Sequence, residues 1–134
     1  MEDGGFFSET RLCGHNNVIW GKQNEELYGF DSTSSIEYFG SLNRIEGIQF
    51  YKDGTGKVKN PAQNFSQLRW NFSKNNTVCI SIEWSDENTY YECKIVQLKK
   101  GKLRLKYEFK QGMFIMWDFY KSRDWDFYSP IFSM

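Results

Sequence analysis

Residues 77–110 decide the fold, and they read TVCISIEWSDENTYYECKIVQLKKGKLRLKYEFK. Apolar and polar residues alternate through residues 77–84 and again through residues 102–110, which is the period of a strand with one buried face. The connections at residues 85–88 and 99–101 are short and rich in residues that favour tight turns. Connections this short join only antiparallel neighbours, so the segment predicts two consecutive hairpins.

The same pattern continues outward from this segment in both directions. Further strands are predicted at residues 44–52, 57–59, 65–73, 89–98 and 113–120. No gap between them is long enough for a helical crossover, which excludes parallel βαβ units. We therefore expect residues 1–134 to form one all-β domain, an antiparallel meander of about eight or nine strands. Closure into a barrel, or a flattened barrel or sandwich, would remove the exposed edge of a long open meander.

The N-terminal third is less regular. Residues 6–13 suggest a strand that ends at Gly14, and residues 17–22 suggest a second short strand. Residues 31–42 begin with helix-capping residue types, so they predict either a short N-terminal helix or a loop followed by a strand. The strand at 113–120 is apolar on both faces, and we expect the N-terminal segment to cover one of them.

Composition narrows the classes of function. Seventeen basic residues balance seventeen acidic ones, which argues against nucleic-acid binding and against electrostatic binding to an anionic membrane. No apolar stretch reaches 18 residues, so no membrane span is expected. The first residues lack the pattern of a secretory signal, and three cysteines are an odd number, so the chain as it stands predicts a cytoplasmic protein. A signal removed from the chain would change this expectation.

Few residues suggest catalysis or metal binding. Cys13 and His15 could form a nucleophilic pair, but no group that would orient the imidazole can be identified. Adding Cys79 and Cys93 gives four zinc-ligand residue types, without the spacing of a zinc knuckle. Asp118 lies in an apolar strand, where a structural carboxylate paired with Arg123 or a backbone N–H is expected. We therefore predict no catalytic residue, metal or cofactor, and keep an enzyme of unknown type as the third hypothesis.

Part of the ladder resembles the small lipocalin-like domains of the bacterial calycin type. The resemblance covers roughly residues 45–110, and its motifs are those of hairpins. The chain departs from the family at Cys93, where the family has a tyrosine, and the Trp20-Gly21 pair only loosely matches the opening Gly-x-Trp strand. The residues that match are Phe50-x-x-Asp53-Gly54-Thr55, Trp70, Val78-x-Ile80-x-Ile82 and Ile95-x-x-Leu98-x-x-x-x-Leu103-x-Leu105.

Two hypotheses for function follow, and neither predicts an oligomeric state. The resemblance implies a non-enzymatic binding protein that holds a small apolar ligand inside the barrel. Its ligand-binding residues would be Trp70, Trp84, Tyr107 and Trp117.

The alternative is a cytosolic protein-binding module, such as an immunity protein or an inhibitor of a toxin or enzyme. It rests on the aromatic content of 19% and on the word Trp-Asp-Phe-Tyr, which occurs at residues 117–120 and again at 125–128. Its interface residues would be Tyr28, Tyr38, Phe39, Trp125, Phe127 and Tyr128.

Overall fold

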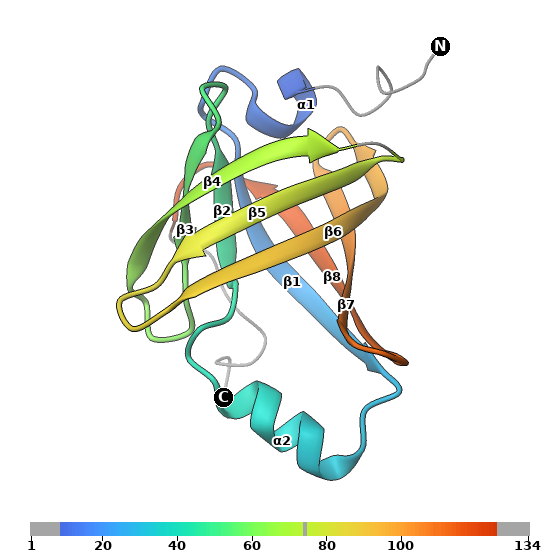
Figure 1. The fold of residues 1–134 in the computed structure, drawn as a ribbon. Helices are drawn as coiled ribbons and strands as arrows, with labels where there is room; N and C mark the ends of the chain where they lie inside the picture. The colour runs from blue at the N-terminus through green and yellow to red at the C-terminus, as the bar shows by residue number, and fades with distance from the viewer. Residues whose placement is uncertain (1–8, 74, 126–134) are drawn as a thin grey trace.

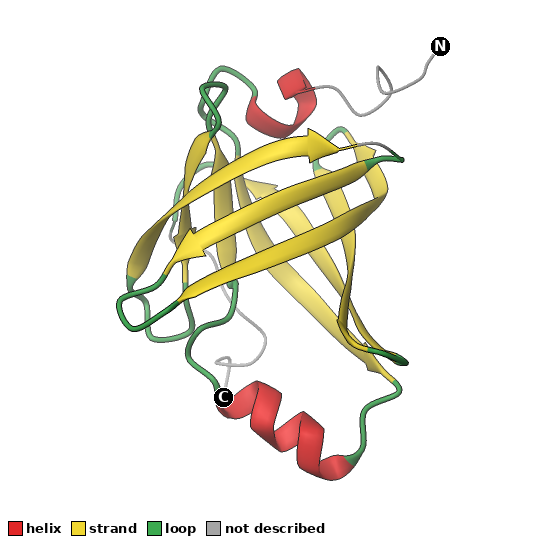
Figure 2. Ribbon diagram, viewed as in Figure 1, coloured by secondary structure: helices red, strands yellow, loops and turns green. Residues whose placement is uncertain are grey.

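The chain forms a closed barrel of eight antiparallel strands that follow one another in sequence order (Figures 1 and 2). The structure is a computed structural model that describes residues 9–73 and 75–125. This architecture confirms the predicted all-β meander and selects the barrel over the sandwich. The strands are β1(Ile19–Tyr28), β2(Gly47–Phe50), β3(Thr55–Lys59), β4(Phe65–Ser73), β5(Thr77–Glu83), β6(Asn88–Lys99), β7(Lys102–Lys110) and β8(Met113–Ser122).

From β2 to β8 the strands lie where the alternation predicts them. The apolar members of each alternating set point into the barrel; Val78, Ile80, Leu103 and Leu105, for example, are fully buried. Burial of one face of each strand removes the apolar surface from water, which is the main favourable term in folding. The interior is therefore lined by the residues that the two-residue period assigns to it.

The first strand was only partly predicted. β1 begins near the expected position but extends to Tyr28, because the polar residues 23–26 belong to the strand. β1 pairs with β8 over its whole length and so closes the barrel. Among the described residues, the N-terminal segment therefore pairs with the edge of β8 through β1, in place of the predicted cover over a face of that strand. The strand suggested at residues 6–13 was also wrong for its described part, which is helix α1(Glu9–Cys13).

Two short helices lie at opposite ends of the barrel (Figure 1). α1 packs at the end where β1 starts, and the indole N–H of Trp20 donates to its Leu12 carbonyl at 3.0 Å. α2(Ser32–Gly40) lies at the other end, in the connection between β1 and β2. Asp31 and Ser34 form a reciprocal capping box at its start. The helical alternative for residues 31–42 is thereby confirmed.

Candidate functional site

A β-bulge in β1 places two charged side chains inside the barrel. On a regular strand, residues three apart face opposite sides of the sheet. The pairing of β1 with β8 shifts between Lys22 and Asn24, so Lys22 lies opposite Phe119 and Glu25 lies opposite Trp117. Both β8 residues are buried in the core, and the side chains of Lys22 and Glu25 are 2% and 4% exposed. The extra residue of the bulge therefore gives both charges the same, inward, direction.

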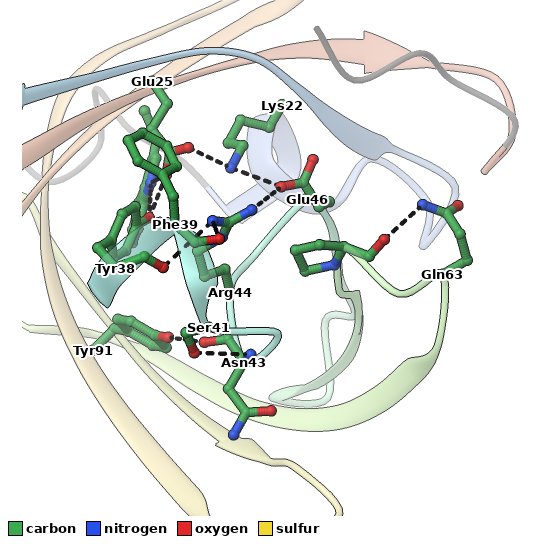
Figure 3. A network of polar contacts seen from close by, with 12 residues as sticks. Lys22, Glu25, Tyr38, Phe39, Ser41, Asn43, Arg44, Glu46, Gln63 and Tyr91 are labelled. Carbon is green, nitrogen blue, oxygen red and sulfur yellow. Dashed lines mark hydrogen bonds and ion pairs between the residues drawn. The ribbon is translucent and has the colours of Figure 1, made fainter. Parts of the chain in front are cut away.

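These two residues belong to a buried cluster of four charges at the α2 end of the barrel, the charged cluster (Figure 3). Lys22 Nζ lies 3.0 Å from Glu25 Oε1 and 3.0 Å from Glu46 Oε2. Arg44 NH2 lies 3.7 Å from the same Glu46 oxygen. Two cations and two carboxylates make the cluster neutral, which reduces the cost of burying it without removing that cost.

Several buried polar atoms at this end have no hydrogen-bond partner within the described residues. They are Arg44 Nε, Glu46 Oε1 and the indole nitrogen Nε1 of Trp84. Trp84 directly follows β5, at the same end of the barrel as α2, where Asn43 donates to Asp86 in the β5–β6 turn. Buried polar groups are nearly always hydrogen-bonded, so unpaired ones at the same end of the barrel indicate capacity for another polar group there.

Aromatic rings surround the charged cluster. The Tyr107 and Trp117 rings are stacked with centroids 5.7 Å apart, and Tyr91 packs edge-on to both of them. Tyr38 of α2 enters the barrel beside them and donates its phenol hydrogen to Glu25 Oε2. Burial, followed by the charge of Glu25, raises the pKa of Tyr38 well above its ordinary value, so the phenol stays protonated at neutral pH.

Two of the four predicted ligand-binding residues, Tyr107 and Trp117, are in contact with each other. Trp84, Tyr107 and Trp117 are all at the α2 end, and Trp117 Nε1 donates to Glu25 Oε2 at 2.9 Å. Trp70 lies at the opposite end, where its indole N–H donates to the Tyr51 carbonyl at 2.8 Å. Their role in ligand binding remains a prediction, and the geometry groups Trp70 with the structural core instead.

The predicted interface residues do not form one surface. Tyr28 and Phe39 are about two-fifths exposed, at 42% and 41%, but Tyr38 is buried against the barrel. Tyr38 could meet a protein partner only after α2 moved away. Trp125 is half-buried and packs edge-on to Phe65 with ring centroids 5.0 Å apart. Phe127 and Tyr128 lie outside the described residues.

The side chains considered for catalysis or zinc binding are separated. Cys13 is buried near the α1 end, whereas His15 is exposed. Cys79 lies opposite Glu92 and Cys93 lies opposite Val78, so the two thiols are on different faces of the hairpin. Over the described residues, no three His, Cys, Asp or Glu side chains are grouped to hold a metal ion.

Asp118 has a different partner from the one expected. It faces Arg104 of β7, with Arg104 Nε 3.4 Å from Asp118 Oδ1, and it accepts from Asn24 Nδ2 at 3.2 Å. Arg123, the partner that the sequence suggested, lies beyond the end of β8. The carboxylate is on the outer side of the barrel wall, away from the charged cluster, where it links β1, β7 and β8.

A groove of about 670 Å³ runs along the outside of the barrel where β6 and β7 separate. The two strands pair as far as Cys93 and Tyr107, after which β6 stays with β5 and β7 stays with β8. Tyr107 lines this groove and also belongs to the aromatic cluster inside. Tyr107 therefore contacts both the groove and the aromatic rings at the α2 end of the interior.

Sequence reasoning missed the charged residues of this site. Lys22, Glu25, Arg44 and Glu46 read as ordinary surface residues, because nothing in their spacing indicates the bulge. Comparison of the chain with protein-family models, with curated proteins and with solved structures finds no match. In the part of the chain that the structure describes, no helix is both long and apolar enough to cross a membrane. The arguments for function therefore rest on the geometry of the site.

Proposed function

We propose that this chain is a non-enzymatic binding protein that holds a small amphipathic ligand at the α2 end of its lipocalin-like barrel. The charged cluster carries the proposal. A barrel of this size can fill its interior with apolar side chains, as the α1 half of this one does with Trp20, Phe50 and Phe119. Four buried charges with unpaired polar atoms stabilise the fold little, because the cost of their desolvation offsets most of their attraction.

The surroundings suggest what such a ligand would look like. Glu46 Oε1 could accept a hydrogen bond, and Arg44 Nε and Trp84 Nε1 could donate one. The rings of Tyr91, Tyr107 and Trp117 would pack against an apolar body. The small apolar ligand expected from the sequence is therefore refined to one with an apolar body and a polar head.

The indole N–H groups can report by NMR where a ligand binds in the barrel. In an amide NMR spectrum, each tryptophan gives a separate indole signal. We would titrate the protein with a panel of ten-carbon ligands that share a chain and differ in head group, namely decanol, decanamide, decanoate and decylamine. Binding at the α2 end should shift the signals of Trp84 and Trp117 saturably. The signals of Trp20 and Trp70 should stay in place, because backbone carbonyls bond them at the far end.

Equal shifts of all the indole signals, or saturable shifts of none, would count against the proposal. Native mass spectrometry of gently purified protein provides a second measurement that needs no choice of ligand. A bound mass of a few hundred daltons, lost in the variant Trp84→Ala but retained in Trp70→Phe, would support the α2 end as its location.

A protein-binding role is the second candidate, and one observation favours it. The outward side of α2 and the loop after it expose three apolar side chains, with Ile36 74%, Phe39 41% and Leu42 58% exposed. A toxin or an enzyme that this protein inhibits could cover them. The triple variant Ile36→Ser, Phe39→Ser, Leu42→Ser would abolish that interaction, and it would leave the indole shifts of the first proposal intact.

A further inference from the structure

Tyr38 is the one residue of α2 that is buried in the barrel. The neighbouring Ile36 and Phe39 are 74% and 41% exposed, so the attachment of the helix to the barrel depends mainly on Tyr38. Arg44 adds to it by donating to the carbonyl of Phe39 at 2.7 Å. A nine-residue helix is marginal in water without packing, so α2 is positioned by these few contacts.

The Tyr38 ring occupies a slot made of other flat groups. Phe30, Phe39 and Phe109 meet it edge-on, with centroids 6.1, 5.4 and 6.0 Å away. The Arg44 guanidinium lies 5.4 Å from the ring centroid, within the range of a cation–π contact. Perpendicular ring contacts and a cation favour an aromatic occupant over an aliphatic one, because only a π-system has the negative face and positive edge that such contacts use.

The hydroxyl of Tyr38 uses both of its hydrogen-bonding functions. It donates to Glu25 Oε2, and it accepts from Trp117 Nε1 at 3.2 Å, a donor that it shares with that carboxylate oxygen. An ammonium group at this point would face the indole N–H with no lone pair to offer. A carboxylate would face the charge of Glu25, which repels it. A neutral hydroxyl satisfies both neighbours.

From this geometry we infer that Tyr38 occupies the position of the ligand, and that the ligand class is a small neutral phenol. The inference rests on the function proposed above, which it makes specific. The phenol enters when α2 lifts and withdraws Tyr38, and its hydroxyl takes over the contacts to Glu25 and Trp117. Lys22 keeps its 3.0 Å contact to the other oxygen of Glu25 during the exchange, so the cluster stays neutral.

The test uses 4-methylphenol, which reproduces the tyrosine side chain, and toluene, which lacks only its hydroxyl. With wild-type protein, 4-methylphenol should shift the Trp117 indole signal saturably. Toluene should bind at least tenfold more weakly, because it lacks one hydrogen bond to a charged group. Hydrogen exchange of the α2 amides should become faster when 4-methylphenol is bound, because the helix is displaced. 4-Methylbenzylamine and 4-methylbenzoate should bind no better than toluene.

Two variants extend the test. Tyr38→Phe removes the competing hydroxyl and keeps the ring, so 4-methylphenol should bind it about tenfold more tightly than it binds wild type. The matched control Ile36→Ala changes an exposed residue of the same helix and should leave the affinity unchanged. If Tyr38→Phe proves too unstable, the comparison of ligands and the exchange measurement on wild type decide alone.

The possible results separate the two proposals. Equal affinities for 4-methylphenol and toluene, or unchanged exchange in α2, would overturn this inference. If a ten-carbon ligand still shifts the Trp84 and Trp117 signals in that case, the proposed function stands without it. If no ligand of either set shifts those signals saturably, both are refuted.

Discussion

The substitution Lys22→Met tests whether the charged cluster acts as one electrostatic unit. Lys22 makes two contacts of 3.0 Å to carboxylates, and all three side chains are at most 4% exposed. At an effective dielectric constant of about 20, each contact is an attraction of about 5 kcal/mol, most of which offsets the cost of burying the charges. Methionine is unbranched like lysine and one heavy atom shorter, so it keeps most of the stem and removes the charge and its hydrogen bonds.

The substitution should destabilise the Glu46 carboxylate more than the Glu25 carboxylate. Glu25 keeps the hydrogen bonds from Tyr38 and Trp117, but Glu46 keeps only Arg44 at 3.7 Å. Breaking a buried pair in this way typically costs about 3–5 kcal/mol. We expect Lys22→Met to lower the free energy of unfolding by that amount, a large part of the roughly 5–15 kcal/mol of a typical domain.

Urea unfolding at neutral pH, followed by tryptophan fluorescence, measures this loss as a lower midpoint at constant slope. The matched control is Glu26→Gln, which removes an ion pair of similar length, 3.0 Å, whose side chains are 30% and 43% exposed. It should cost less than about 1 kcal/mol. Adding Glu46→Gln to Lys22→Met should restore about 1–2 kcal/mol, because the unpaired charge disappears. A cost for Lys22→Met no larger than that of the control would refute the reasoning.

Three further predictions concern individual groups. Burial raises the pKa of Tyr38 above its unfolded value of 10.0, so folding retains its proton and the free energy of unfolding should fall as pH rises past that value. Tyr38→Phe should make that fall shallower by about 1.4 kcal/mol per pH unit in urea titrations above about pH 10, and an unchanged slope would contradict the assignment. Gly29→Ala should cost about 1–3 kcal/mol and speed amide exchange in α2, because φ is +79° and the new Cβ would lie 2.0 Å from the Gly112 carbonyl oxygen; Gly40→Ala, with open space around it, should cost nothing. Burial raises the pKa of the Cys93 thiol, which should react with a disulfide reagent only at the rate of unfolding; fast labelling in the native protein would show that the hairpin opens locally.

The strands from β2 onward were predictable because their information is local. Alternation in residues such as Val78 and Ile80 sets the buried face, and the intervening turns set the antiparallel order. Barrel closure followed from the number of strands and from the penalty on a free edge. These features need no knowledge of distant residues.

The site was not predictable from the sequence because it depends on contacts between residues far apart in the chain. The bulge near Gln23 depends on how β1 fits against β8, and a polar run gives no periodic signal for it. Without the bulge, Lys22 and Glu25 would point in opposite directions, and at most one of them would face the interior. Tyr38 was likewise read as exposed because a short amphipathic helix does not reveal which side chain enters a neighbouring barrel.

The tryptophan side chains give the reason for placing the proposed site at one end of this barrel. Trp20 and Trp70, in the α1 half, donate to backbone carbonyls, so their N–H groups serve the fold. In the α2 half, the N–H of Trp84 has no partner among the described residues, and that of Trp117 is shared between Glu25 and Tyr38 of α2. A donor held by the scaffold cannot change partners without cost to the fold, whereas a donor bonded to Tyr38 can exchange it for an equivalent hydroxyl. We therefore place the proposed ligand at the α2 end, where its hydroxyl would replace that of Tyr38 without the strands having to move.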